Sequence, residues 1–438
     1  MSDVDANLEG YNTLLKTWHL FYNERKHNFL NKNKSEGSYD DSGKYTVWPL
    51  AVYLQALVDG CRIYPKELIP YLGPAFKVLE KYYTPKYRAY CASEYFNGND
   101  DVYYDDNAQV ASAFITAYEV TGDTNYLMKG DEVVRFLLTG YLNTAPGGVR
   151  WHVGKDGSNT CTTAESGLAA IRLVKFIPQN QQNVQGFRNQ LIQYAISCCR
   201  WIFDKLQDPE DHLICDGLEP VKDDHGKIID YKRNHCKWTY NQGTPLSLCA
   251  ILYYVTRDDW YKEQAEKLAD AATDRNRELF DRTPELESAR FYHDSVYFYQ
   301  LLAEGFADFI LYFEGRSPEP LVQRVKDESL RNMHYVYTYL YDPNDKLYFQ
   351  TYELFRIDKP HYDQYLELTQ GKGARNYEPG GGEREKVDGV PVEKRKLTKS
   401  LIACGAVARI FFQSARLNPR FKADRKQWHG SKYKLRQN

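Results

Sequence analysis

Apolar side chains recur every three or four residues along most of this chain. The first clear series is Val47, Leu50, Ala51, Leu54, Leu57 and Val58, and a later one is Val184, Phe187, Leu191, Tyr194, Cys198 and Trp201. This spacing places the apolar residues on one face of a helix. The same pattern predicts about twelve helices. They span residues 7–32, 45–60, 65–82, 105–121, 125–140, 160–176, 182–206, 243–256, 259–274, 290–314, 318–340 and 398–416.

A repeated turn suggests that these helices are paired. Residues 118–126, YEVTGDTNY, are echoed by residues 253–261, YYVTRDDWY. In both segments a helix ends, a short turn with an aspartate follows, and the next helix begins with an aromatic residue. Helical hairpins that repeat along a chain stack into a ring or a solenoid. We therefore predict an all-α fold in which residues 1–438 form one closed α/α barrel.

Four irregular segments separate some of the predicted helices. Residues 84–104, 141–159 and 207–242 are expected to converge at one end of the barrel, where loops usually carry the ligand-contacting residues. Residues 341–397 are expected to form an insertion of loops and short strands before the last helix, because Leu347–Tyr352 alternates like a strand and Glu378–Glu383 is rich in glycine.

Composition narrows the classes of partner. The chain has 57 basic and 59 acidic residues, well mixed, and a formal net charge of −2, so no electrostatic footprint for nucleic acid or an anionic membrane is visible. No run of 18 apolar residues occurs, and the acidic N-terminus lacks the features of a secretory signal. We expect a cytoplasmic protein. The nine cysteines lack metal-ligand or pairing spacing, so reduced thiols, no metal and no cofactor are expected.

Two adjacent aspartates carry the strongest chemical signal. Asp105 and Asp106 follow two tyrosines at the predicted start of a helix. Glycoside hydrolysis needs one carboxyl group to protonate the leaving oxygen and another to act at the anomeric carbon. Close carboxylates also resist ionising together, which keeps one protonated near neutral pH. Two other interpretations stay open here: acidic caps of a helix N-terminus, and calcium binding by the four aspartates at 100–106.

Three further segments accompany this pair. They are Gly147–His152, which contains Trp151; Cys215–Gly217, which contains Asp216; and Trp238–Thr244, which combines aromatic faces with amide groups. Amides and aromatic rings together suit a sugar, whose hydroxyl groups need hydrogen-bond partners above a stacking surface. Taken singly, each segment is also typical of a turn or a helix cap.

Taken together and in this order, the YYDDNA, GGVRW, ICDG and WTYNQGT segments resemble the motifs of glycoside hydrolase family 76, the α-1,6-mannanases. The resemblance runs from about Trp48 to about residue 315. It implies a barrel of six inner and six outer helices and endo-hydrolysis of α-1,6-linked mannose chains, with retention of configuration and no cofactor. It also implies that Asp105 is the nucleophile and Asp106 the acid/base.

The same resemblance suggests which residues bind the sugar. By position, the pocket would be lined by Asp216, Tyr240, Asn241 and Gln242. From the same motifs we expect further contacts from Tyr104, Asn107, Trp151 and Trp238. Gln109 departs from the family, whose members typically have a bulky aromatic residue there, and this position bears on how a sugar chain lies across the site.

Three functions from different classes are therefore compared. The first is a retaining hydrolase or transglycosylase acting on α-linked mannose oligosaccharides or polysaccharides. The second is a sugar epimerase or isomerase on a similar barrel, which would use histidines for proton transfer; the candidates are His152, His235 and His293. The third is a non-catalytic carbohydrate-binding protein, against which the intact aspartate pair argues.

Overall fold

A computed structural model describes residues 4–30, 45–178 and 182–417. Thirteen α-helices lie in this part of the chain. They are α1 (Ala6–Phe21), α2 (Val47–Ile63), α3 (Pro65–Leu79), α4 (Tyr104–Thr121), α5 (Thr124–Leu138), α6 (Thr160–Val174), α7 (Gln182–Leu206), α8 (Tyr240–Thr256), α9 (Asp259–Ala272), α10 (Val296–Phe313), α11 (Glu319–Tyr339), α12 (Lys359–Thr369) and α13 (Leu401–Ala415). None of these helices has the length and apolarity needed to cross a membrane.

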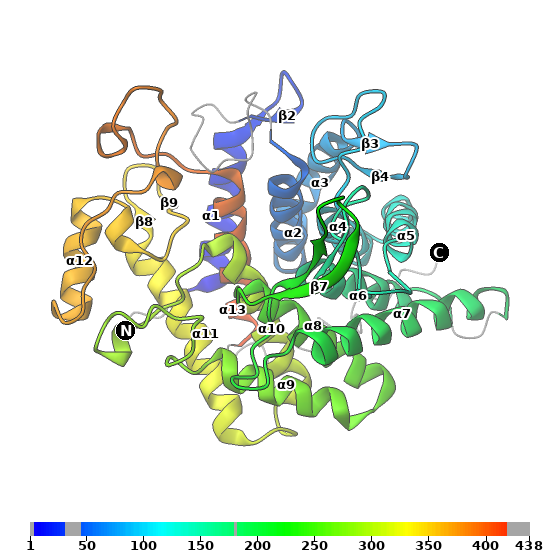
Figure 1. The fold of residues 1–438 in the computed structure, drawn as a ribbon. Coiled ribbons are helices and arrows are strands. Elements are labelled where there is room, and N and C mark those ends of the chain that lie inside the picture. The colour runs from blue at the N-terminus through cyan, green and yellow to red at the C-terminus, as the bar shows by residue number, and fades with distance from the viewer. Residues whose placement is uncertain (1–3, 31–44, 179–181, 418–438) are drawn as a thin grey trace.

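Six helices form a closed inner ring. In the order α2, α4, α6, α8, α10 and α13, each contacts the next, and α13 contacts α2 to complete the circle. The six remaining barrel helices, α1, α3, α5, α7, α9 and α11, each pack on the outside of one inner helix (Figure 1). Burial follows this division, since every residue of α13 from Leu401 to Ala415 is buried. The predicted all-α barrel of six inner and six outer helices is confirmed.

Glycine allows two inner helices to approach each other closely. A Cβ atom added to Gly243 in α8 would lie 2.2 Å from the backbone oxygen of Leu301 in α10. The reverse contact is equally tight, because a Cβ on Gly305 would lie 2.6 Å from the backbone oxygen of Gly243. Any side chain at either position would push the two helices apart. The α8–α10 contact therefore depends on this glycine pair.

A buried arginine joins three inner helices within the ring. Arg409 of α13 is 2% exposed; its Nε lies 3.0 Å from Oδ2 of Asp59 in α2, and its Nη2 lies 2.9 Å from Oε2 of Glu304 in α10. Arg172 of α6 donates to the other oxygen of Glu304. Each buried charge thus has an opposite partner, which such a position requires.

The strands are short and antiparallel. They are β1 (Tyr22–Asn23), β2 (Asn28–Phe29), β3 (Tyr83–Thr84), β4 (Ala89–Tyr90), β5 (Ser158–Asn159), β6 (Gly217–Lys222), β7 (Ile228–Asn234), β8 (Tyr341–Asp342) and β9 (Leu347–Tyr348). Three pairs form small hairpins, of which β8 and β9 lie at the left in Figure 1, and β5, β6 and β7 form a three-stranded sheet in front of the barrel. The sheet places the chain before α6 against the chain before α8.

Three predicted elements differ from the structure. The first helix ends at Phe21 rather than residue 32, because Tyr22 and Phe29 pair across a hairpin and both rings pack on Trp18; residues 31 and 32 lie outside the described residues. The helix predicted at 290–314 begins only at Val296, after an extended segment that contains Asp294. The insertion 341–397 also contains a helix, α12, whose N-cap Asp358 accepts a hydrogen bond from the backbone of His361.

Candidate active site

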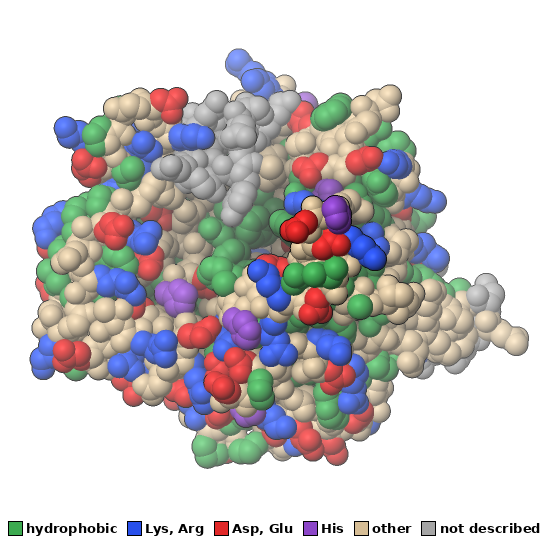
Figure 2. Space-filling view, in the orientation of Figure 1, with side chains coloured by type: hydrophobic (Ala, Val, Ile, Leu, Met, Phe, Trp, Pro, Cys, Tyr) green, Lys and Arg blue, Asp and Glu red, His purple; other side chains and the backbone are tan. Residues whose placement is uncertain are grey.

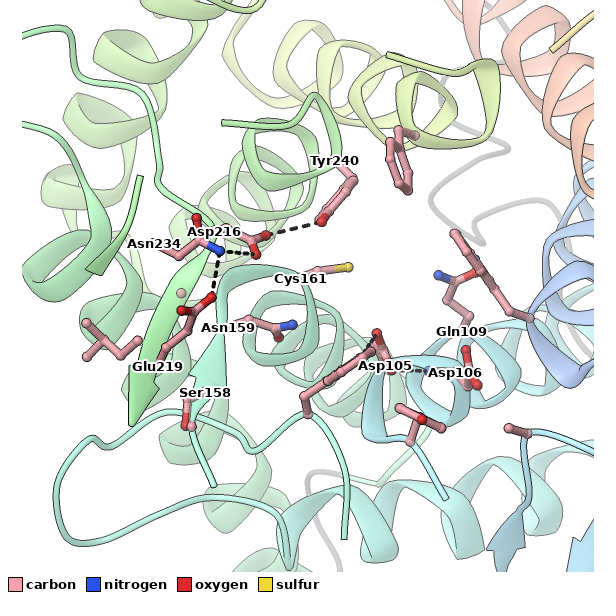
Figure 3. A pocket seen from close by; sticks show the side chains of 18 of the residues that line it. Asp105, Asp106, Gln109, Ser158, Asn159, Cys161, Asp216, Glu219, Asn234 and Tyr240 are labelled. Carbon is pink, nitrogen blue, oxygen red and sulfur yellow. Dashed lines mark hydrogen bonds between the residues drawn. The ribbon is translucent and has the colours of Figure 1, made fainter. Parts of the chain in front are cut away.

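A cavity of about 750 Å³ opens at the end of the barrel where the inner helices begin. The N-caps and the first two turns of the inner helices supply Thr46, Trp48, Asp105, Asp106, Gln109, Asn159, Cys161, Tyr240, Tyr297, Phe298 and Leu301. The loops and the strands β5, β6 and β7 supply Ala92, Asp101, Tyr103, Trp151, Asp156, Gly157, Ser158, Asp216, Gly217, Leu218, Glu219, Pro220 and Asn234. Figure 2 shows the hollow near the centre of the molecule, and Figure 3 shows its side chains. Segments 84–104, 141–159 and 207–242 converge here, as predicted.

The pocket is acidic and partly aromatic. Six carboxyl side chains line it, and none of its lining residues in the described ranges is a lysine, an arginine or a histidine. Trp48 and Phe298 stand on one wall with ring centroids 6.1 Å apart, and Tyr103 and Trp151 stand on the other, 4.9 Å apart. Such a lining disfavours an anionic ligand and suits a neutral polyhydroxylated one.

The two aspartates occupy the first turn of α4. Oδ1 of Asp105 accepts a hydrogen bond from the backbone N–H of Asp106, at 3.0 Å. Its Oδ2 accepts one from Nε1 of Trp151, at 2.9 Å. The N-cap residue itself is Tyr103, whose side chain makes no capping bond. One Asp105 oxygen therefore serves the helix terminus, while the indole holds the other beside the pocket.

The environment separates the pKa values of the pair. Burial raises the pKa of Asp105 to about 6, against the lowering effect of its hydrogen bonds from Asp106 and Trp151. Burial and the charge on Asp105 raise the pKa of Asp106 well above its usual range. Asp105 therefore loses its proton first, and Asp106 keeps a proton near neutral pH.

A second acidic group stands across the pocket. Oδ1 of Asp216 accepts a hydrogen bond from Nδ2 of Asn241, at 2.9 Å. It also accepts one from the hydroxyl of Tyr240, at 3.2 Å (Figure 3). Burial raises the pKa of Asp216. The next residue, Gly217, packs so closely on β5 that an added Cβ would lie 2.6 Å from the backbone oxygen of Ser158. This contact fixes the loop that carries Asp216.

Of the eight residues predicted to bind substrate, three line the pocket: Trp151, Asp216 and Tyr240. Asn241 is buried behind the pocket wall, where its side chain donates a hydrogen bond to Asp216. Trp238 lies beside the wall residue Phe298, with ring centroids 5.7 Å apart.

The side chains of the remaining three predicted residues pack on, or form hydrogen bonds with, neighbouring segments close to the site. Tyr104 is stacked on Phe136 with centroids 4.4 Å apart, away from the pocket surface. Asn107 exchanges hydrogen bonds with the backbone of Tyr90. Gln242 does the same with the backbone of Ile214. Five of the eight side chains therefore lie off the cavity surface, where they can position its walls, and their direct contact with a ligand stays a prediction.

Several lining residues were missed by the sequence motifs. Those with side chains suited to ligand contact are Trp48, Cys161, Glu219, Asn234, Tyr297 and Phe298, while Tyr103 also lines the pocket and lies within the YYDDNA motif. Trp48, Cys161, Tyr297 and Phe298 sit in the first turn of an inner helix, as Asp105 does. That shared position is the signal that could have identified them. Asp294, also missed, accepts hydrogen bonds from both the backbone and the hydroxyl of Thr239 and so anchors the start of α8.

The three candidate histidines of an epimerase do not line the pocket. His152 accepts a hydrogen bond from the backbone of Gly154 and lies 3.3 Å from Asp101. His293 contacts the backbone oxygen of Glu278 at 2.8 Å, and His235 is exposed outside the pocket. None of them is in a position to exchange a proton with a ligand in this cavity.

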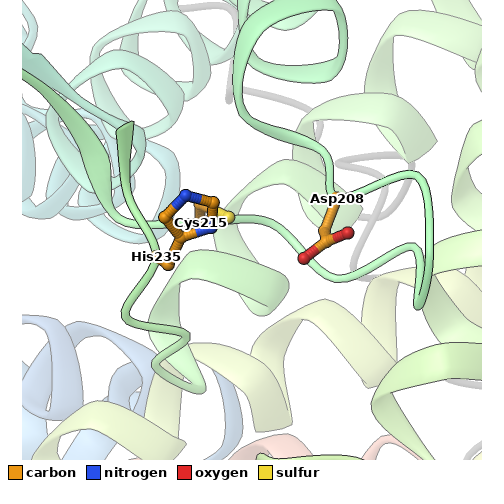
Figure 4. A group of neighbouring side chains, drawn as sticks. All are labelled: Asp208, Cys215 and His235. Carbon is orange, nitrogen blue, oxygen red and sulfur yellow. The ribbon is translucent and has the colours of Figure 1, made fainter. Parts of the chain in front are cut away.

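One group in the described residues combines metal-ligating side chains. The ligand atoms of Asp208, Cys215 and His235 lie within 4.8 Å of one another (Figure 4). However, the ammonium of Lys237 lies 2.8 Å from Oδ2 of Asp208 and 2.8 Å from Oδ2 of Asp211, so a cation already pairs with both carboxylates. Burial also raises the pKa of Cys215 to about 11, whereas a metal needs the thiolate. The group fits a metal ion poorly.

Comparisons with known proteins relate this chain to glycoside hydrolases. The sequence model described as Glycosyl hydrolase family 76 matches residues 11–328. The Meiotically up-regulated gene 191 protein of Schizosaccharomyces pombe is 29% identical over 427 residues, which are 93% of this chain and 92% of that protein.

Solved structures share the fold. The GH76A α-1,6-mannanase from Salegentibacter sp. HEL1_6 matches with a TM-score of 0.68 and 17% identity, over 94% of this chain and 100% of that one. An inactive variant of that enzyme, with two neighbouring aspartates replaced by asparagine, was solved in complex with α-1,6-mannotriose. It matches with a TM-score of 0.66 and 17% identity, over the same shares of the two chains.

Proposed function

This chain belongs to glycosyl hydrolase family 76, and from that premise we propose that it is a retaining glycoside hydrolase that cleaves α-1,6-linked mannose chains. The observation that carries the proposal is the Asp105/Asp106 pair at the floor of an acidic, aromatic pocket. In the mannanase of similar fold, the variant described as inactive lacks two neighbouring aspartates. That description supports a catalytic role for the adjacent pair here.

The two aspartates have different tasks in a retaining mechanism. A carboxylate oxygen of Asp105 attacks the anomeric carbon and forms an ester bond, while the bond from that carbon to the leaving oxygen breaks. Asp106 gives its proton to the leaving oxygen. In the second step, Asp106 takes a proton from water, the water oxygen attacks the same carbon, and the ester bond to Asp105 breaks. Two inversions give net retention.

The protonation states at rest suit these tasks. The nucleophile must be ionised, and Asp105 has the lower pKa of the pair because Trp151 and the first turn of α4 stabilise its charge. The acid must hold a proton, and Asp106 holds one because it is buried beside a charged neighbour. The assignment of roles therefore rests on the surroundings of each residue.

The walls of the pocket suit a neutral sugar. The ring of Trp151 is 40% exposed and offers an apolar face to a pyranose. Asp216 and Tyr240 offer hydrogen-bonding groups on the opposite side. The choice of mannose and of the α-1,6 linkage comes from the family. A sugar hydroxyl in place of water in the second step would make the same enzyme a transglycosylase.

A product analysis tests the proposal. The purified protein is incubated with linear α-1,6-mannan, with branched mannan and with free N-acetylhexosamines, and the products are separated and followed by proton NMR. We expect shortened α-1,6-mannose oligomers whose new reducing ends are first α, or elongated oligomers if transfer dominates. An epimerised monosaccharide would overturn the proposal in favour of an epimerase. Saturable binding of mannan without any product would favour a carbohydrate-binding protein.

A further inference from the structure

A third carboxyl group lies behind the aspartate pair, on the neighbouring inner helix. Glu165 of α6 is 4% exposed and is not among the residues that line the pocket. Its link to the pocket is Gln109, which lines the cavity one turn after Asp106 on α4 and donates a hydrogen bond from Nε2 to Oε1 of Glu165, at 3.3 Å. We propose, resting on the function proposed above, that Glu165 is a positioning residue that fixes Gln109 in the pocket floor and acts on Asp106 through its own charge.

The hydrogen bonding at this link is incomplete. Oε2 of Glu165 and Oε1 of Gln109 are both buried, and neither has a hydrogen-bond partner among the described residues. Hydrogen bonds from Gln109 and Cys161 favour the charged form of Glu165, but its burial has the larger effect and favours the neutral acid. Glu165 therefore keeps a proton over part of the pH range in which the enzyme works.

No basic side chain in the described residues forms an ion pair with Glu165. The groups around it are as follows: Asp105 and Asp106 on α4, Cys161 on its own helix, and Glu304 on α10. Two arginines on the inner helices, Arg172 and Arg409, pair with Glu304 instead. Arg409 also pairs with Asp59 of α2. Helix α8 carries no charged side chain, and the outer helix α7 presents Cys198 to α6 at Gly167.

These surroundings set an order of ionisation. Burial raises the pKa of Asp105 to about 6, so this group ionises first. Burial and then the charge on Asp105 raise the pKa of Glu165 well above its usual range. Burial, the charge on Asp105 and then the charge on Glu165 raise the pKa of Asp106. Asp106 therefore keeps its proton after Asp105 has ionised, and a charge on Glu165 adds to that of Asp105 in holding this proton.

The amide at position 109 is what makes this coupling possible. Its Nε2 group is the hydrogen-bond donor that reaches Glu165 from the pocket floor. Gln109 keeps the buried carboxyl fixed at a defined place behind the pocket, and the side chain of Gln55 in α2 in turn donates to the backbone oxygen of Gln109, at 3.3 Å. Glu165 touches no reacting atom, so its effect is on protonation and on the pocket floor.

The test compares wild type with Glu165→Gln, which keeps the size of the side chain and a partner for Gln109 but cannot ionise. Ser166→Ala, the next buried residue on α6, is the matched control. The pH dependence of kcat/KM on an α-1,6-mannan oligosaccharide is measured for all three. We expect the alkaline limb of Glu165→Gln to move down by about 1 pH unit, because one like charge near Asp106 is lost. The acid limb of the kcat/KM profile, which reflects the ionisation of Asp105, should not move.

A uniform fall in kcat with both limbs unmoved would show a merely structural role and overturn the inference. A second measurement does not depend on activity. The infrared spectrum of the double variant Asp105→Asn/Asp106→Asn is compared at pH 7 with that of the same protein carrying Glu165→Gln as well. A protonated carboxyl band lost with Glu165 is expected, and its absence would contradict the inference. Inactivity of wild type on mannan would instead defeat the proposed function and leave the infrared result to decide this one.

Discussion

The indole nitrogen of Trp151 donates a hydrogen bond to Oδ2 of Asp105 across 46 residues of sequence, at 2.9 Å. The contact ties the loop before α6 to the first turn of α4, and it stabilises the ionised form of Asp105. A residue expected to stack on sugar is thereby also a partner of the expected nucleophile. Its two roles can be separated by substitution.

Trp151→Phe should keep an aromatic face and lose the hydrogen bond. Because the N–H group favours the charged carboxylate, its loss raises the pKa of Asp105, and the acid limb of kcat/KM should move up by roughly 0.5 to 1 pH unit. The pH profile on a mannan oligosaccharide measures this. Trp260→Phe, on the outer helix α9, is the control and should leave the limb unmoved. A fall in kcat/KM that is equal at all pH values would mean that only stacking was lost.

Asp106→Asn should inactivate the enzyme and make it more stable at neutral pH. The pKa of Asp106 is about 4 in the unfolded chain and is raised in the folded protein. At pH values between these two pKa values, Asp106 is ionised in the unfolded chain but still holds its proton in the folded protein. Wild-type stability therefore falls as pH rises through this window, and the asparagine variant escapes the fall. We expect a gain on the order of 1 kcal/mol at pH 8 that vanishes near pH 4.

Urea unfolding at several pH values measures that gain. Asp131→Asn, which removes an exposed partner of Arg135, serves as the control and should show no such pH-dependent gain. A variant that is less stable than wild type at pH 8 would mean that Asp106 is a stabilising helix cap rather than a strained catalytic group.

Tyr240→Phe should weaken substrate binding without unfolding the protein. The hydroxyl of Tyr240 donates to Asp216, while its ring packs on Phe298 with centroids 4.6 Å apart. Phenylalanine keeps the ring contact and removes one hydrogen bond, so KM should rise up to roughly tenfold with a smaller change in kcat. Tyr240→Ala should lose the packing as well. A large drop in melting temperature for the phenylalanine variant would place the hydroxyl among the groups that stabilise the fold.

Gly243→Ala should destabilise the barrel, whereas Gly73→Ala should not. The added Cβ at position 243 would collide with the backbone of α10, and relieving the clash requires the two helices to move apart, at a cost of about 1–3 kcal/mol or more. At Gly73, in α3, an added Cβ meets nothing within 4 Å, and alanine should stabilise the helix by roughly 0.5–1 kcal/mol. Denaturant unfolding of both variants measures the difference. Equal stabilities would show that α8 and α10 are free to separate.

Chelation should leave the protein unchanged, because Lys237 already neutralises the acidic group at Asp208 and Asp211. Lys237→Met should lower stability by several kcal/mol, since it leaves two partly buried carboxylates without their partner. Melting temperatures with and without EDTA, zinc or calcium measure both effects. A rise in the melting temperature of wild type on adding zinc would show that Asp208, Cys215 and His235 do hold a metal.

The sequence by itself determined most of the helices and the adjacent aspartate pair. A repeat of apolar residues every three to four positions is a local property, so ten of the helix predictions needed only modest changes at their ends. The first helix was predicted too long at its end, and the helix at 290–314 was predicted to start too early. Asp105 and Asp106 are neighbours in the chain, so no fold could have separated them. The two aspartates and the walls formed by segments 84–104, 141–159 and 207–242 were thus accessible from the sequence.

Tertiary structure alone decided the long-range contacts. A helical pattern shows that a face is apolar but not which residues cover it, so the side chains that meet where α13 packs on α2 could not be predicted. For the same reason the motifs could not show that Trp151 binds Asp105, or that Gln109 reaches Glu165 over 56 residues. Nor could they show which of eight polar or aromatic residues face the cavity. Side-chain direction and partner depend on how the inner helices are rotated within the ring, and that rotation is set by packing among residues far apart in the chain.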